Sequence, residues 1–197
     1  GEALWRRRVH RCAALATTVI TGSESSKRDI VECFDVPPQR VEVIRHGIDH
    51  ERFSPGEVAP ERLAPLGIGD AGFILYVGNI DPRKRVDLVL DAWEASTLRA
   101  QGLVLVLASR HAWGADDVVA RVAAGVPGVI WLRDADDDLV RDLYRAARAF
   151  VFPSEYEGFG FPALEAQACG APVVASNRGA LAENLAATGR TASEHVE

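Results

Sequence analysis

The sequence has 197 residues and a mass of 21.3 kDa, which is enough for one domain or one and a half. A hydrophobic fraction of 48% with 25% charged residues is ordinary for a globular protein and excludes a disordered, collagen-like or disulfide-dense chain. The net charge of −6 argues against nonspecific binding to nucleic acid, which needs a basic surface. The longest apolar runs, such as residues 103–108, are much shorter than the roughly 20 residues that cross a bilayer.

The three cysteines, Cys12, Cys33 and Cys169, lie far apart and form no Cys-x-x-Cys or Cys/His spacing. They are therefore expected to be free thiols in a reducing cytosol, and no zinc or redox motif is predicted. The chain begins at Gly1 and has no Met, so we expect it to be a piece of a longer protein.

Residues 1–50 are expected to form a small strand–helix–strand unit. A strand at 18–20 precedes a polar turn and a helix that reaches about Cys33, and residues 41–44 alternate like a second strand. Such a unit is too small to hold a core alone. Residues 51–72 are rich in Pro and Gly and are predicted to be a linker.

From residue 73, short apolar runs alternate with segments of helical periodicity. Asp116 and Asp117 are expected to cap the second of these helices, and the acidic run from Asp136 precedes the third. Apolar strands that alternate with helices predict a doubly wound α/β domain whose parallel sheet is covered on both faces. Strands are expected at 73–78, 103–108, 129–132, 149–152 and 172–175, with helices between them and a last helix over 179–187.

Sheets of this kind bind ligands beyond the carboxyl ends of their strands, and the loop after residue 152 is the most informative one. It carries Glu157 and Gly158-Phe159-Gly160, and the helix that follows places Glu165 about one turn in. The glycines let backbone approach a ligand, and the first N–H groups of the helix favour an anion such as phosphate. Two carboxylates beside an anion are expected to accept hydrogen bonds from hydroxyls on either side of it.

A phosphate also requires cations, and Arg83 and Lys84 follow the first strand of the predicted sheet, at the same edge. A guanidinium forks onto phosphate oxygens, and an ammonium acts as a point charge. An anion site, two cations and two hydroxyl-binding carboxylates together describe a pocket for a nucleotide sugar.

Four separated stretches also occur in the order and spacing of one known family. Glu157-x7-Glu165, followed by residues 168–174, closely resembles the signature of the family-four retaining glycosyltransferases of the GT-B fold. Residues 21–27, 43–49 and 76–84 resemble the end of the acceptor domain, the interdomain crossing and the first strand and loop of the donor domain of that family. The resemblance covers about residues 15–185.

The resemblance implies a two-domain GT-B enzyme that is represented mainly by its donor-binding domain, a Rossmann-like parallel sheet with helices on both faces. Residues 1–50 would be the tail end of the N-terminal acceptor domain. Residues 51–72 would be the interdomain linker. Residues 73–190 would be the donor-binding domain, truncated at its C-terminus.

The resemblance also implies roles for single residues. Glu157, Lys84 and Arg83 would be the catalytic residues: Glu157 by the hydroxyls of the donor sugar, the two cations on the diphosphate that leaves. Glu165 would hold the ribose hydroxyls. Backbone facing the donor would come from Gly78, Gly158, Phe159 and Gly160. The Asp134 to Asp138 cluster is interpreted as a helix N-cap and not as a metal motif, and the family is usually metal-independent, so neither a metal nor a cofactor is expected.

Departures from the family pattern leave the nucleotide base and the sugar open. Asn79 stands where many members have Arg, and Ser109 and Arg133 stand where glycines are common. His46 lies in the crossing segment near the expected cleft and is a candidate for contact with donor or acceptor.

The leading hypothesis is transfer of a hexosyl group, with mannosyl favoured, from a nucleotide-diphospho-sugar to a carbohydrate or lipid-linked acceptor with retention of configuration. The enzyme would be cytoplasmic, with peripheral contact to the inner face of the membrane left open, and these residues alone would be inactive. One alternative is a non-catalytic nucleotide-sugar-binding fragment or degenerate copy. A dehydrogenase-type Rossmann domain is disfavoured, because the strand ending at Gly78 is not followed by Gly-x-Gly-x-x-Gly.

Overall fold

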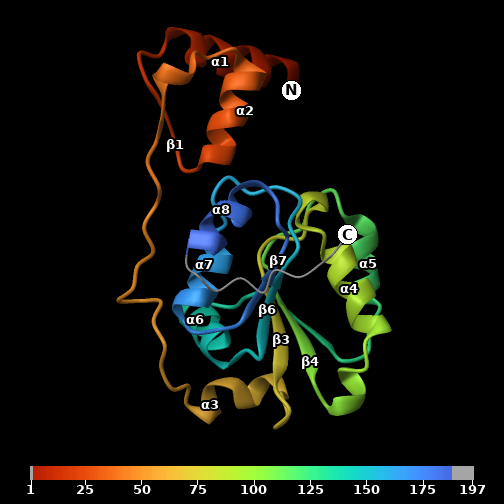
Figure 1. Cartoon of the computed structure of the whole chain (residues 1–197). Coiled ribbons are helices and arrows are strands. Elements are labelled where there is room, and N and C mark those ends of the chain that lie inside the picture. Colours follow the sequence, from red (N-terminus) through yellow and green to blue (C-terminus); the bar gives the residue numbers. More distant parts are fainter. Residues whose placement is uncertain (1, 188–197) are drawn as a thin grey trace.

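The computed structural model describes residues 2–187 and contains two parallel sheets joined by an extended segment (Figure 1). The smaller sheet pairs β1 (Val19–Thr21) with β2 (Val41–Val43), and helices α1 (Glu2–Leu15) and α2 (Glu24–Phe34) accompany it. Helix α2 begins where the Ser23 side chain accepts the N–H of Ser26 at 3.1 Å. The strand–helix–strand arrangement expected for this part of the chain is therefore confirmed.

The larger sheet has five parallel strands in the order β5-β4-β3-β6-β7, with helices on both faces (Figure 1). The doubly wound α/β fold is confirmed. Its strands are β3 (Phe73–Val77), β4 (Val104–Ala108), β5 (Val129–Leu132), β6 (Ala149–Phe152) and β7 (Val173–Ala175). Its helices are α4 (Val86–Ala95), α5 (Asp116–Ala123), α6 (Asp137–Ala146), α7 (Phe161–Ala168) and α8 (Gly179–Ala187).

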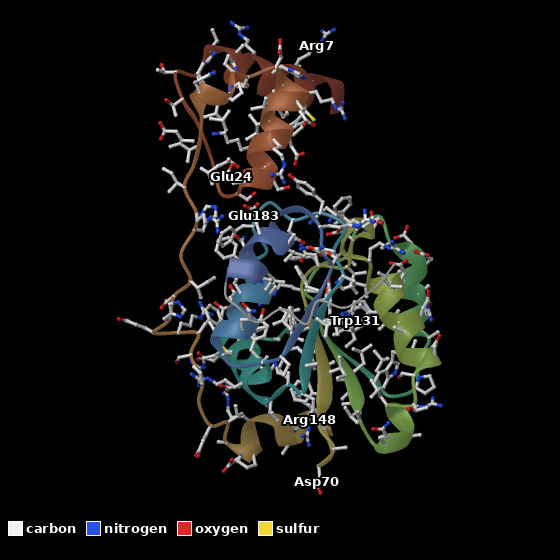
Figure 2. All side chains as sticks on the ribbon, viewed as in Figure 1. Arg7, Glu24, Asp70, Trp131, Arg148 and Glu183 are labelled. Carbon is white, nitrogen blue, oxygen red and sulfur yellow. The ribbon has the colours of Figure 1, made fainter. Side chains whose placement is uncertain are left out.

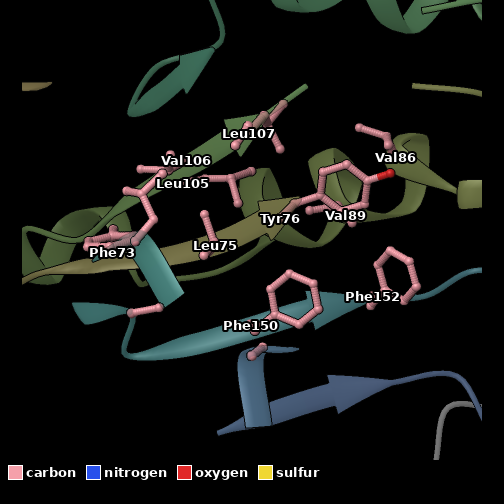
Figure 3. Close-up of a cluster of buried hydrophobic side chains, with 14 of the residues drawn as sticks. Phe73, Leu75, Tyr76, Val86, Val89, Leu105, Val106, Leu107, Phe150 and Phe152 are labelled. Carbon is pink, nitrogen blue, oxygen red and sulfur yellow. The ribbon is translucent and has the colours of Figure 1, made fainter. Parts of the chain in front are cut away.

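The core lies between this sheet and its helices. Aromatic side chains of β3 and β6 form its centre, where the Phe150 and Phe152 rings stack 5.6 Å apart and Tyr76 lies beside them (Figure 3). Leu105 and Leu107 continue the core along β4, and all of these side chains are buried. Strands buried on both faces explain why the sequence shows continuous apolar runs here and not alternation.

An extended segment over residues 44–59 leads from the small sheet to the opposite end of the large one (Figure 1). There the short helix α3 (Pro60–Leu63) docks on α6, where Arg62 Nε donates to the buried Asp142 carboxylate at 2.9 Å. Arg145 of α6 also donates to the Ser54 carbonyl at 2.8 Å. The predicted linker is thus partly helical and is held by α6. The predicted boundaries at 50 and 72 stay predictions, and the one at 190 lies outside the described residues.

Two helix starts differ in how they are capped. Asp136 accepts the N–H of Leu139 at 2.7 Å and caps α6, as the acidic run indicated. The prediction that Asp116 and Asp117 cap α5 is wrong, because Ala115 is the N-cap and both carboxylates lie inside the first turn. There they stabilise the positive end of the helix dipole instead of bonding to a free N–H group. Among the helices of residues 2–187, none is long and apolar enough to cross a membrane.

The loops after β3 and β4 are fastened together by Ile80. Its N–H donates to the His111 carbonyl at 2.9 Å, and its carbonyl accepts the N–H of Trp113 at 3.0 Å. The Ile80 side chain is fully buried. This pairing fixes one part of the sheet edge at which ligands are expected.

We expect Ile80→Ala to lower the free energy of unfolding by about 2–5 kcal/mol, since it empties a buried site that holds two loops. Leu88→Ala on the exposed side of α4 is the matched control and should change it by no more than about 0.5 kcal/mol. Urea unfolding of both variants measures the difference. Equal effects would show that Ile80 does not fasten the loops.

Candidate functional site

The strand order reverses between β3 and β6, which are neighbours in the sheet but not in the sequence. The chain leaves β3 towards one face of the sheet and leaves β6 towards the other, and in sheets of this kind ligands bind where two such loops separate. All five strands are parallel, and their carboxyl ends face the small unit of α1 and α2 (Figure 1). The loops after β3 and β6 are where the sequence placed most candidate site residues.

The loop after β3 is held by hydrogen bonds of its own and presents two cations. Gly78 has φ +148°, and the buried Tyr76 hydroxyl donates to the Asn79 carbonyl at 2.8 Å. The buried Asp81 carboxylate then accepts the N–H of Lys84 at 3.2 Å and caps the 3-10 turn Pro82–Lys84.

Arg83, Lys84 and Glu157 meet between these two loops. Lys84 Nζ lies 2.5 Å from Glu157 Oε1, and Arg83 Nη1 lies 3.0 Å from the same oxygen. Lys84 and Glu157 are buried, and Lys84 Nζ also lies 4.7 Å from the centre of the Phe152 ring. The structure therefore brings together the three predicted catalytic residues, although their roles stay predictions. One oxygen of the Glu157 carboxylate pairs with both cations. The carboxylate therefore occupies the position at which these cations would bind an anionic ligand.

The Glu157–Gly160 loop is shaped by helix α8. The Glu157 carbonyl accepts the N–H of Ala180 at 3.0 Å, and Asn184 Nδ2 donates to the Phe159 carbonyl at 2.7 Å. Gly160 has φ +89°, and a Cβ at this position would lie 2.5 Å from Leu181 Cδ2. Only glycine meets both the backbone conformation and the packing here.

Glu165 lies in a different set of contacts from Glu157. Its carboxylate accepts a hydrogen bond from the Tyr144 hydroxyl of α6 at 3.2 Å. Burial raises the pKa of Glu165, and the bond from Tyr144 and the charge of Arg52 offset part of that rise. Arg52 in turn pairs with Asp137 at the start of α6 at 2.7 Å. The two carboxylates thus have different partners, and their roles towards a ligand stay predictions.

The small unit contacts the site through α2. Both oxygens of the Glu183 carboxylate on α8 accept N–H groups at the start of α2, from Glu24 at 3.1 Å and from Ser25 at 3.0 Å (Figure 2). Tyr156, next to Glu157, donates its hydroxyl to the Asp29 carboxylate of α2. A hollow of about 480 Å³ opens beside this contact, lined by Trp5, Arg6, His10, Thr21, Ser26, Asp29, Ile30, Cys33, Phe34 and Tyr156.

His46 lies at the same junction. Its ring packs edge-on against Phe159 at 4.9 Å and lies 5.3 Å from Phe161. A Cβ on Gly22 would lie 2.8 Å from the His46 ring, so glycine lets the crossing segment approach β1 closely. The candidate histidine of the crossing segment is therefore next to the Gly-Phe-Gly loop.

The loops after β4 and β5 hold two of the residues that depart from the family pattern, Ser109 and Arg133. The Arg133 guanidinium lies 3.8 Å above the Trp131 ring, and Trp131 Nε1 donates to the Ser109 carbonyl at 3.2 Å. Arg110 Nη2 donates to the Ala135 carbonyl at 3.4 Å. Arginines thus line this side of the sheet edge. Within residues 2–187, no three His, Cys, Asp or Glu side chains are grouped so that they could hold a metal ion.

Sequence reasoning missed the residues that hold the site from outside. Asn184 and Glu183 belong to the last helix, and their partners lie more than twenty residues away, so no local motif pointed to them. Tyr156 stands inside the recognised stretch, but nothing in the spacing showed that it contacts α2. Arg85 follows the predicted cations directly, and no motif pointed to it.

A family model described as glycosyl transferases group 1 matches residues 71–195, which is more than half of the chain. Over 191 residues the chain is 34% identical to O-antigen chain mannosyltransferase B of Escherichia coli, with 93% of this chain and 49% of that protein covered. Over 177 residues it is 36% identical to D-inositol 3-phosphate glycosyltransferase of Frankia alni, with 84% and 43% covered. The chain spans about half the length of the curated relatives it matches.

Solved structures share the fold. Anabaena HepE, solved with UDP and glucose, aligns with a TM-score of 0.76 at 21% identity, over 90% of this chain and 49% of that one. WaaG, a glycosyltransferase involved in lipopolysaccharide biosynthesis, aligns with a TM-score of 0.70 at 22% identity, over 86% of this chain and 47% of that one. The GT-B fold class expected from the sequence is confirmed.

We expect Gly160→Ala to lower the melting temperature by about 2–8 °C, because an L side chain at positive φ costs roughly 1–2 kcal/mol. Gly158→Ala is the matched control, since a Cβ there meets only Ser26 Oγ at 3.6 Å. Thermal unfolding followed by circular dichroism compares them. A similar loss in both would contradict the special requirement at Gly160.

Glu165→Gln should stabilise the chain, and the gain should grow as the pH rises from about 4 to about 7. The folded state raises the pKa of Glu165, so its favourable contribution is present at low pH and lost as the carboxyl ionises. Melting temperatures across that range measure the effect, with the exposed Glu57→Gln as control. A gain independent of pH would show that ionisation of Glu165 is not its cause.

Proposed function

The chain belongs to the group 1 glycosyl transferases, and from this we propose that it is the donor-binding part of an enzyme that transfers a hexosyl group from a nucleotide sugar. The observation that carries the proposal is the meeting of Lys84 and Arg83 with Glu157 at the reversal of strand order. The cations of one loop would bind a diphosphate, and the carboxylate of the other would accept hydrogen bonds from the attached sugar.

We propose that the donor diphosphate replaces Glu157 as the partner of the two cations. Phosphate oxygens form charge-assisted hydrogen bonds at least as strong as those of a carboxylate. Glu157 Oε1 then no longer binds Lys84 Nζ at 2.5 Å and can accept hydrogen bonds from hydroxyls of the sugar. Glu165, beside the start of α6, would accept those of the ribose.

The proposed reaction keeps the configuration of the sugar. The acceptor oxygen forms a bond to the anomeric carbon on the face from which the diphosphate departs, and the bond from that carbon to the phosphate oxygen breaks. The acceptor proton passes to the leaving diphosphate. Arg83 and Lys84 stabilise the negative charge that develops on this group, and the loops hold it in position. These cations would do so without a metal ion, and no cofactor takes part.

The similarity to O-antigen chain mannosyltransferase B supports a mannosyl donor and a carbohydrate or lipid-linked acceptor. We place the acceptor on the side of α1 and α2, where the hollow beside Tyr156 adjoins the Glu157 loop. The exposed Trp5 and the arginines of α1 would suit contact with an anionic membrane surface in the cytoplasm. The chain by itself would bind donor without turning it over.

Calorimetric titration of the folded chain with GDP, UDP and ADP tests the donor site. Lys84→Met should weaken the bound nucleotide roughly 10- to 100-fold, because a hydrogen bond to a charged group contributes about 1.5–3 kcal/mol. Lys27→Met on α2 is the matched control, because it removes the other lysine of the chain. A folded chain that binds none of the three nucleotides would overturn the proposal that this part holds the donor.

Glu157→Gln tests the exchange of partners. It should bind the nucleoside diphosphate more tightly than the parent chain does, because the competing carboxylate is gone. The extra affinity that the attached sugar provides should fall, because an amide is a weaker acceptor for its hydroxyls. Unchanged affinity for both ligands would rule out the exchange.

A further inference from the structure

Arg85 joins the turn Pro82–Lys84 to helix α4 with an unusual backbone conformation. Its φ of 52° and ψ of 45° are left-handed, and among the described residues other than glycine only Asp35 also has a positive φ. Side chains of L residues rarely adopt this region, because their Cβ crowds the following carbonyl. Arg85 directly follows Lys84, so this bend lies between Lys84 and the first residue of α4.

The side chain of Arg85 bridges two carboxylates. Nε lies 3.1 Å from both oxygens of Asp87, and Nη2 donates to the same carboxylate at 3.0 Å. On its other edge, Nη1 donates to Glu155 Oε1 at 2.8 Å. Asp87 belongs to the first turn of α4, and Glu155 belongs to the loop after β6. The guanidinium therefore ties the start of α4 to the loop that carries Glu157.

A second tie runs parallel to this one. The N–H of Glu155 donates to the Arg83 carbonyl at 2.8 Å. Lys84, between Arg83 and Arg85, is thus flanked on both sides by residues that are bonded to Glu155. The Lys84–Glu157 contact is the third link between the same two loops.

The Arg85 bridge is too exposed to contribute much to global stability. The side chains of Arg85 and Glu155 are 35% and 54% exposed, and surface ion pairs of this kind add little to global stability. Both edges of the guanidinium that the bridge uses face carboxylates, so Arg85 is not a direct phosphate ligand in this arrangement. The bridge instead affects the position of the loop after β3 relative to the loop after β6.

We propose that Arg85 is a positioning residue of the donor site: through Glu155 and Asp87 it holds Arg83 and Lys84 at the distance from the Glu157 loop that a diphosphate requires. The inference rests on the proposed function, because the diphosphate is the ligand that these cations would bind. It assigns a role to three residues, Arg85, Asp87 and Glu155, that do not touch the donor.

The chain offers a readout that needs no ligand. Lys84 is buried and Lys27 is less so, and these are the two lysines of the sequence. An amine-acylating reagent followed by mass spectrometry gives the labelling rate of Lys84 relative to Lys27. Arg85→Gly suits this measurement, because glycine keeps the left-handed backbone and removes only the side chain. Glu155→Gln removes the charge at the other end of the bridge.

In both variants we expect Lys84 to be labelled faster relative to Lys27, and UDP and GDP to bind about tenfold more weakly, since small misplacements of binding groups are costly. The melting temperature should not fall by more than about 2 °C in either variant. Arg121→Gln is the matched control. Arg121 also bridges two carboxylates, Asp91 and Glu94 of α4, but away from the loops, so neither labelling nor binding should change.

The two readouts separate the two proposals. A parent chain that binds no nucleotide contradicts the proposed function, and the labelling of Lys84 still decides whether Arg85 positions it. Unchanged labelling in Arg85→Gly and Glu155→Gln overturns the positioning role, whatever the nucleotides do. A large fall of the melting temperature in both variants overturns it as well, because the bridge would then act on the whole fold.

Discussion

Lys84 and Glu157 come from loops that the sheet topology brings together, and the rest of the site depends on their contact. Their strands, β3 and β6, are adjacent in the sheet, yet the chain forms β4 and β5 between them. The aromatic core beneath these strands fixes the separation of the two loops. A cation from one loop and a carboxylate from the other then meet at 2.5 Å, and both are buried. Low exposure strengthens this attraction and makes either group costly to leave alone.

Several residues around the Lys84–Glu157 contact hold the two loops in place. Asp81 fixes the turn that carries the cations, and Arg85 ties this turn to the loop of the carboxylate. Helix α8 holds the same loop from behind through Asn184. Each of these partners is a polar group whose bonds are satisfied within the protein, so the loops are shaped before any ligand arrives. Pre-organised loops spare a ligand the entropy of ordering them.

Much of the fold could be predicted because buried strands appear in the sequence as apolar runs. Strands buried on both faces must be apolar throughout, and parallel strands must place their carboxyl ends at one edge, so Lys84 and Glu157 could be expected to meet. The bond from Asn184 to Phe159 could not be predicted, because it depends on how α8 packs. The caps proposed for α5 were wrong for a related reason: either Ala115 or an aspartate can precede the first turn, and tertiary packing decides which.

Neighbouring residues of α8 serve opposite sides of the molecule. Asn184 bonds to the loop beside Glu157, whereas Glu183 accepts the first N–H groups of α2 in the small unit. A tilt of α8 would therefore move both the loop beside Glu157 and the carboxylate that binds the start of α2. The two halves of such a protein cannot diverge independently at this helix. A substitution that adapts α8 to a changed α2 also shifts the backbone around Glu157. Selection that acts on the small unit therefore also affects the loop beside Glu157.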